Sequence, residues 1–222
     1  MNMLDKPHIT VKGIGRIKRA PDTIVLTMSI ETMNREYRKA VNQAAAELDT
    51  LRQSLCLIGF EKDAIKTADF SIESAYDDQR DEDGTRRRVF AGYQVDHELT
   101  LAFPLDMKKL DAVISVLADS LANPCVYIAF TIADTDSAKA EILEKATKDA
   151  YEKASILCKA AQAKLGRLLS INYSWDEVSF STGDNMKFCA PNDGMYKACT
   201  FDFQPEDIKA SDTVEFIWEL EQ

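Results

Sequence analysis

The longest helical pattern in the chain covers residues 137–166, where no proline interrupts the sequence and the only glycine is the last residue. Small and apolar residues recur there at steps of three and four, which places them on one face of a helix. They are Ile142, Ala146, Ala150, Ala154, Leu157, Ala161 and Leu165. Most are alanines, so we expect the helix to approach a partner surface, a sheet, closely. Asp136 or Ser137 is the expected N-cap and Gly166 the expected C-cap.

Two shorter helices are predicted over residues 35–58 and 105–121. In the first, Asn34 is the expected cap, Gly59 ends the helix, and one face carries Ala40, Ala44, Leu48, Leu51, Leu55 and Ile58. In the second, the inward face carries Leu110, Val113, Ile114, Leu117 and Leu121.

Alternation of apolar and polar residues predicts strands. They cover residues 9–19, 23–31, 68–76, 89–103, 125–133, 167–175 and 213–220. The first two flank the turn Pro21-Asp22 and are expected to pair as a hairpin. A second hairpin turns at Asp83-Gly84, where acidic residues precede a cluster of three arginines and the two charge signs can face each other. Its strands are long enough to project as an arm beyond the helices.

Residues 176–211 have weak periodicity and contain Gly183, Pro191, Gly194 and Pro205, so they are predicted to form one long irregular loop. The loop is rich in aromatic residues, which argue against full disorder. They are Phe180, Phe188, Tyr196, Phe201 and Phe203. Two interpretations stay open: a flap over a sheet edge, or a contact surface for another subunit or a small hydrophobic ligand.

The resulting order is ββαββαβαβ, a loop, then β, which is typical of an α+β fold with three helices packed on a mostly antiparallel sheet. No linker composition divides the chain. One domain over residues 1–222 is therefore expected, with two structural halves as the alternative.

The net charge of −10 disfavours a nucleic-acid partner and an anionic membrane surface. No segment approaches the roughly 18 apolar residues of a membrane span, and no signal sequence is evident at the N-terminus, so a cytoplasmic location is expected unless a leader was removed. The five cysteines are odd in number and irregularly spaced. Reduced, packed thiols are the expected state.

Few residue patterns in the sequence point to a catalytic, cofactor-binding or metal-binding site. Gly13 and Gly15 lack the third glycine and the following helix of a dinucleotide-binding loop, so they indicate a bent strand or a close backbone approach. His97 lies between Val95 and Leu99 on an apolar face and is interpreted as a structural histidine. Cys189 and Cys199 lack the further ligands that zinc needs. No catalytic residue, cofactor or metal is therefore assigned.

Three segments together resemble the SIMPL-domain family, long described as a domain of unknown function. They are Ile9-x-Val11-x-Gly13-x-Gly15 followed by Pro21-Asp22, the alanine-spaced helix with Leu165-Gly166, and residues 204–214, in which Pro205-x-x-Ile208 precedes the last strand. The resemblance extends from residue 8 to 220. It implies an α+β fold and a tendency to form large ring-like or channel-like homo-oligomers. It implies no established catalytic residues.

The leading hypothesis is a non-enzymatic protein whose partner is itself, with contacts made by sheet edges and the arm of residues 70–103. Tyr93 and His97 join the five loop aromatics as candidate interface residues. The alternative is a protein that binds a small ligand or a metal with the loop of residues 176–211. A hydrolase or redox enzyme using Cys189, Cys199 and His97 is the least favoured reading.

Overall fold

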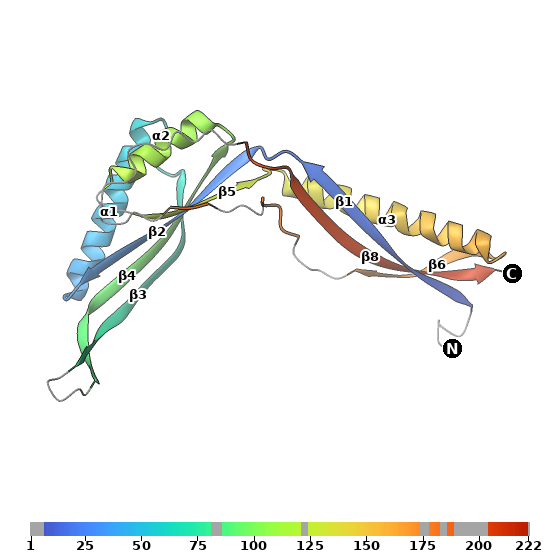
Figure 1. Ribbon diagram of the computed structural model, residues 1–222, viewed down its shortest axis with the longest axis horizontal. Helices are drawn as coiled ribbons and strands as arrows, with labels where there is room; N and C mark the ends of the chain where they lie inside the picture. The colour runs from blue at the N-terminus through green and yellow to red at the C-terminus, as the bar shows by residue number, and fades with distance from the viewer. Residues whose placement is uncertain are drawn as a thin grey trace. The chain divides into compact units, whose positions relative to one another are not determined.

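The structure is a computed structural model that describes residues 7–80, 86–120, 124–173, 178–182, 186–188 and 204–221. The chain divides into two compact units, each with its own sheet (Figure 1). Unit 1 consists of Met1–Pro21, Thr131–Thr182 and Pro205–Gln222, and unit 2 of Asp22–Phe130 and Gly183–Gln204. The described residues form three helices and two antiparallel sheets, which confirms the predicted α+β class.

Unit 1 is built on a three-stranded sheet in the order β1-β8-β6. The elements are β1 (His8–Arg19), α3 (Thr135–Ala160), β6 (Lys164–Tyr173) and β8 (Ile208–Glu221). β1 and β8 come from opposite ends of the chain and pair over twelve residues, from His8 opposite Glu219 to Arg19 opposite Ile208. α3 lies along one face of this sheet (Figure 1).

Unit 2 contains a five-stranded sheet in the order β3-β4-β2-β5-β7. The elements are β2 (Thr23–Asn34), α1 (Tyr37–Leu57), β3 (Ile65–Arg80), β4 (Arg86–Pro104), α2 (Met107–Ala118), β5 (Cys125–Thr131) and β7 (Met186–Phe188). α1 and α2 lie on the same face of the sheet (Figure 1). Their leucines pack on the apolar side of β2 and β4, where each fully buried aliphatic side chain contributes about 2 kcal/mol.

The first predicted hairpin is wrong, because β1 and β2 lie in different sheets. The face of β1 that meets a helix includes Gly13 and Gly15, which suit a helix lined with alanine. The inward face of β2 carries large side chains, from Ile24 to Ile30, which need the leucine-rich core of unit 2. Each strand is therefore placed by the size of the residues that it buries.

The two glycines of β1 allow α3 to pack directly on the strand backbone. A Cβ atom at Gly13 would overlap the carbonyl oxygen of Ala146 and lie 2.7 Å from the Cβ of Ala150. A Cβ atom at Gly15 would overlap the carbonyl oxygen of Ile142. The close backbone approach that the sequence suggested for these glycines is confirmed.

α3 also occupies the outer edge of β1. The side chains of Lys145 and Lys153 donate to the carbonyl oxygens of Arg16 and Lys12, each at 3.3 Å, and the Ile14 amide donates to Asp149 Oδ2 at 2.7 Å. The three helix residues are spaced one turn apart, and the three strand residues are spaced two apart. Side chains of the helix thus bind backbone groups that a neighbouring strand would otherwise bind.

Asp149 carries the central contact of this edge. Its carboxylate also accepts from Lys153 Nζ at 2.6 Å. This hydrogen bond, and then the one from the Ile14 amide, hold the pKa of Asp149 below its ordinary value. The carboxylate therefore remains charged, and its hydrogen bonds charge-assisted, at neutral pH.

The ends of α3 differ from the prediction. Asp134 is the N-cap, accepting from the Ser137 amide at 2.9 Å, so the helix begins two residues before the expected position. It ends at Ala160, where Gln162 takes the left-handed conformation (φ 56°) expected of Gly166. Gly166 lies in β6, and Leu157, predicted to be inward, is 52% exposed. The buried face of an alanine-rich helix is narrow. A small change in the direction of that face along the helix is therefore enough to leave a leucine near the C-terminal end exposed.

Three further boundaries were mispredicted. Asn34 does not cap α1: its side chain accepts from the Glu36 amide at 3.0 Å, and the helix starts at Tyr37. β8 begins at Ile208, so the last four residues assigned to the long loop belong to a strand. β7, Met186–Phe188, pairs with β5 and is too short for alternation to reveal.

We expect Gly15→Ala to destabilise the protein by about 3 kcal/mol, because its methyl group would displace α3 from β1. Urea unfolding followed by circular dichroism measures this change. Lys12→Ala is the matched control, since the Lys12 side chain is 68% exposed and its loss should cost about 0.5 kcal/mol at most. Equal stability of Gly15→Ala and the wild type would contradict the packing described above.

Candidate functional site

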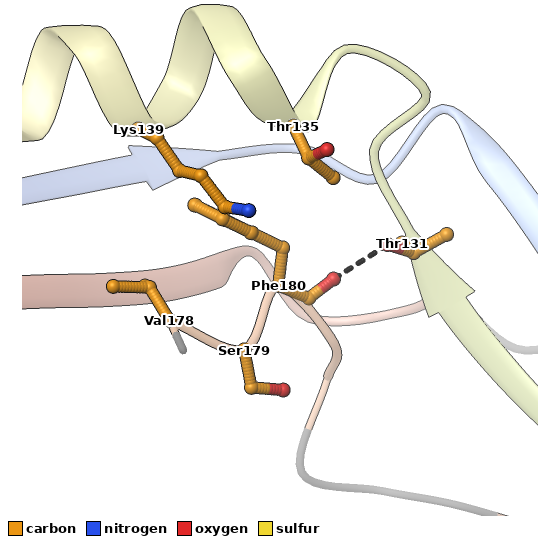
Figure 2. Close-up of a pocket in the computed structure, with 6 residues that line it drawn as sticks. All are labelled: Thr131, Thr135, Lys139, Val178, Ser179 and Phe180. Atoms are coloured by element: carbon orange, nitrogen blue, oxygen red, sulfur yellow. Dashed lines mark hydrogen bonds between the residues drawn. The ribbon is translucent and has the colours of Figure 1, made fainter. Parts of the chain in front are cut away.

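A pocket of about 390 Å³ lies in unit 1, beside the N-terminal end of α3 (Figure 2). Its lining consists of Thr131, Thr135, Lys139, Val178, Ser179 and Phe180. Figure 2 shows the side chains of Thr135 and Lys139 projecting from α3 toward the segment that contains Val178, Ser179 and Phe180. The pocket therefore brings together the start of a helix and the start of the predicted loop of residues 176–211.

The pocket wall is held by a short antiparallel bridge. Thr131 pairs with Ser181, and Thr131 Oγ1 donates to the carbonyl oxygen of Phe180 at 2.6 Å. The Phe180 ring is 6% exposed and packs in a cluster with Ile17, Ile142 and other apolar residues of unit 1. The sequence named Phe180 as an interface residue, and the structure places its ring in a core and its backbone at the pocket.

The polar side chains of the pocket can all donate hydrogen bonds, and its hydroxyl groups can also accept them. Lys139 contributes an ammonium group, and Thr135 and Ser179 contribute hydroxyl groups. Such a set suits a small ligand with anionic or carbonyl oxygens. It lacks a group that the structure identifies as a nucleophile activated by a base.

His97 lies on the inner face of β4 in unit 2 and is 7% exposed. Its Nε2 atom is 3.0 Å from Thr67 Oγ1, and its ring meets the edge of the Phe70 ring at a centroid distance of 5.1 Å. Burial, and then the positive charge of Arg52, lower the pKa of His97 from its ordinary value. His97, a candidate interface residue from the sequence, thus lies buried within unit 2 beside its hydrogen-bond partner Thr67.

Four aromatic rings form a continuous row in unit 2, which we call the aromatic strip: Tyr37, Tyr93, Phe90 and Tyr76. Successive ring centroids are 5.4, 5.3 and 5.9 Å apart, each pair in an edge-to-face arrangement. The rings of Tyr37, Tyr76 and Phe90 are 51%, 50% and 40% exposed. The Arg88 guanidinium lies 5.1 Å from the centre of the Tyr76 ring. The strip is thus an exposed aromatic surface ending in a cation.

Of the aromatic strip, the sequence pointed only to Tyr93. Alternation placed Val89 and Tyr93 on one face of the strand and Phe90 on the opposite face. A register shift between Ala75 and Tyr76 changes which side chains are neighbours, so Phe90 contacts both Tyr76 and Tyr93. The only available signal was the high density of aromatic residues around Gly92.

Of the remaining residues named from the sequence, only Phe188 belongs to the described part of the chain. Phe188 lies in β7, where its backbone pairs with Val126. Tyr196, Phe201, Phe203, Cys189 and Cys199 lie outside the described residues. Within the described ranges, no group of three or more His, Cys, Asp or Glu side chains is arranged to hold a metal ion.

Cysteine chemistry departs from the prediction at one position. Cys56 and Cys158 are free, as expected, but Cys125 is disulfide-bonded. The prediction of reduced thiols was wrong for Cys125 because pairing depends on the separation of two cysteines in space, which sequence spacing does not give.

The described helices include none that combines the length and the apolar character needed to cross a membrane. A family model described as SIMPL, protein of unknown function (DUF541), matches residues 9–218. No curated protein matches the chain.

We expect the stability of the protein to fall as the pH is lowered from 7.5 to 5, because the pKa of His97 is lower in the fold than in the unfolded chain, so the unfolded chain binds more protons in this range. In His97→Gln this pH dependence should be weaker, as measured by urea unfolding at both pH values. His8→Gln, which changes the other histidine, is the control and should retain the wild-type dependence. An equal dependence of stability on pH in all three proteins would contradict the lowered pKa of His97.

Proposed function

Since the chain belongs to the SIMPL family, whose function is undefined, we propose that it is a non-enzymatic protein that assembles with copies of itself through the arm of unit 2. The arm is the segment of residues 70–103, and three rings of the aromatic strip, those of Tyr76, Phe90 and Tyr93, belong to it. The aromatic strip and the open edge of β3 support this proposal.

The aromatic strip is the observation that carries the proposal. α1 begins at Tyr37, whose ring meets Tyr93, and the strip continues outward along the arm to Phe90 and Tyr76. Val89 adds a further side chain that is 41% exposed. Scattered apolar side chains are normal on a surface, but a contiguous row of aromatic residues next to an arginine is typical of protein interfaces.

The backbone of β3 supports the same proposal. β3 has sixteen residues and is the last strand at one end of its sheet, so its outer edge faces no neighbouring strand among the described residues. Long unpaired edges pair readily with another chain. By contrast, Lys145, Asp149 and Lys153 occupy the edge of β1 within the same chain.

The sequence predicts the cytoplasm, whereas a disulfide at Cys125 favours an oxidising compartment. We propose the oxidising compartment, because a persistent disulfide is rare where thiols are kept reduced.

We expect the wild type at micromolar concentration to have a mass in solution several times the 24.9 kDa of one chain, as measured by light scattering behind a sizing column. Replacing Tyr76 and Phe90 together by serine should weaken association about 100-fold or more, because two interface aromatics together often contribute some 3 kcal/mol. Tyr151→Ser is the control, since this tyrosine on α3 is 58% exposed and lies outside the strip. A wild type that remains monomeric would refute the proposal.

The pocket of unit 1 favours a second candidate function, binding of a small ligand with anionic oxygens. Its Lys139 ammonium, Thr135 hydroxyl and Ser179 hydroxyl supply the donors. A thermal-shift screen with small carboxylates and phosphates should then raise the melting temperature of the wild type and raise that of Lys139→Ala less. Lys148→Ala, on an exposed position of the same helix, is the control. Equal shifts in all three proteins would contradict binding in this pocket.

A further inference from the structure

Two long edge strands are open in the described part of the chain. β3 ends the sheet of unit 2, and β6 ends the sheet of unit 1. β6 is a ten-residue strand that, among the described strands, pairs only with β8. Each copy of the protein therefore presents two different strand edges to other copies.

The edge of β3 is acidic. Between Asp69 and Asp78 it carries four carboxylates, those of Asp69, Glu73, Asp77 and Asp78, and no basic side chain. Asp69 also lies directly opposite Glu98 of β4. Asp78 is opposite Arg88, so the carboxylates with no basic residue opposite them on β4 are those of Asp69, Glu73 and Asp77.

The edge of β6 is basic. Lys164 and Arg167 are its only charged residues, and both are exposed. Arg167 Nε donates to Glu219 of β8 at 2.9 Å, with its side chain still 67% exposed. The charges of the β3 and β6 edges are therefore opposite in sign.

Both edges also carry exposed apolar side chains. Leu168 and Ile171 of β6 are 46% and 54% exposed, and Phe70 and Tyr76 of β3 are 46% and 50% exposed. Burial of such side chains provides affinity, while the charges select the partner.

Pairing between identical edges is disfavoured on both strands. Two β3 edges would bring their carboxylates together, and two β6 edges would bring Lys164 and Arg167 of each copy together. Like charges on adjacent strands are destabilising. We propose that β6 of one copy pairs with β3 of the next, which is a heterologous contact.

This inference rests on the proposed self-assembly and specifies its geometry. Because β6 and β3 are both present in every copy, each contact leaves a β3 edge at one end and a β6 edge at the other. Repeated contacts of this kind close into a ring or continue as a filament.

Charge reversal tests the pairing. In one variant Asp69→Lys and Glu73→Lys make the β3 edge basic; in another Lys164→Glu and Arg167→Gln make the β6 edge acidic. Glutamine is used at position 167 because a carboxylate there would face Glu219. Glu144→Lys with Glu152→Lys, at exposed positions of α3, is the control for net charge. Circular dichroism and urea unfolding verify that every variant is folded.

Masses are then measured by light scattering behind a sizing column. We expect each edge variant alone to be a monomer, or to associate at least 100-fold more weakly than the wild type. An equimolar mixture of the two edge variants should regain assembly, because the basic β3 of one complements the acidic β6 of the other. The control variant should assemble like the wild type.

The failing outcomes are distinct. A wild type that is monomeric overturns self-assembly itself, and this pairing with it. If the wild type assembles but the β6 variant does so equally well, or if the mixture stays monomeric, the β6–β3 pairing is overturned while self-assembly stands. If the control variant also dissociates, net charge controls association and the pairing is likewise overturned.

Discussion

The direct packing of α3 on the backbone of β1 is the contact on which unit 1 depends. It requires Gly13 and Gly15 on the strand and small residues such as Ala146 and Ala150 on the helix, because any larger side chain would separate the two backbones. The short distance lets Lys145, Asp149 and Lys153 reach the outer amide and carbonyl groups of β1. The close packing at these small residues thus fixes the position of α3, and it also allows side chains of α3 to bind the outer edge of β1.

The outer edge of β1 in unit 1 and the outer edge of β3 in unit 2 are protected differently. In unit 1 the edge formed by β1 is occupied by a helix from the same chain. In unit 2 the outer edge of β3 meets no other strand in the described residues, and the aromatic strip extends beyond the start of α1. Sheet proteins commonly protect such edges with charge, bulges or partners. β3 has charge and two register shifts, but it also exposes large aromatic side chains. This combination favours a specific partner over simple protection.

Much of the fold could be predicted from the sequence because each element records its own burial. The alternation of β2 and β4 and the alanine stripe of α3 correctly indicated strands, helix and the α+β class. Alternation also placed His97 on the same face as Val95 and Leu99, and all three side chains are buried. These inferences need only local periodicity.

The features that the sequence did not predict are contacts between residues far apart in the chain. β1 pairs with β8, about 200 positions away, and no local pattern distinguishes that partner from β2. The aromatic strip depends on a register shift between Ala75 and Tyr76, and the pocket depends on a bridge between Thr131 and Ser181. A disulfide at Cys125 likewise depends on proximity in space. Such features arise from tertiary pairing, which periodicity does not encode.

The central claim is that the edge of β1 is occupied within one chain, while the edge of β3 is occupied by another copy. Hydrogen–deuterium exchange of backbone amides, measured at low and at high protein concentration, tests it most directly. The account predicts slow exchange of the Ile14 amide at both concentrations, and protection of outward-facing β3 amides that appears only at the high concentration. Equally fast exchange of those β3 amides at both concentrations would contradict it.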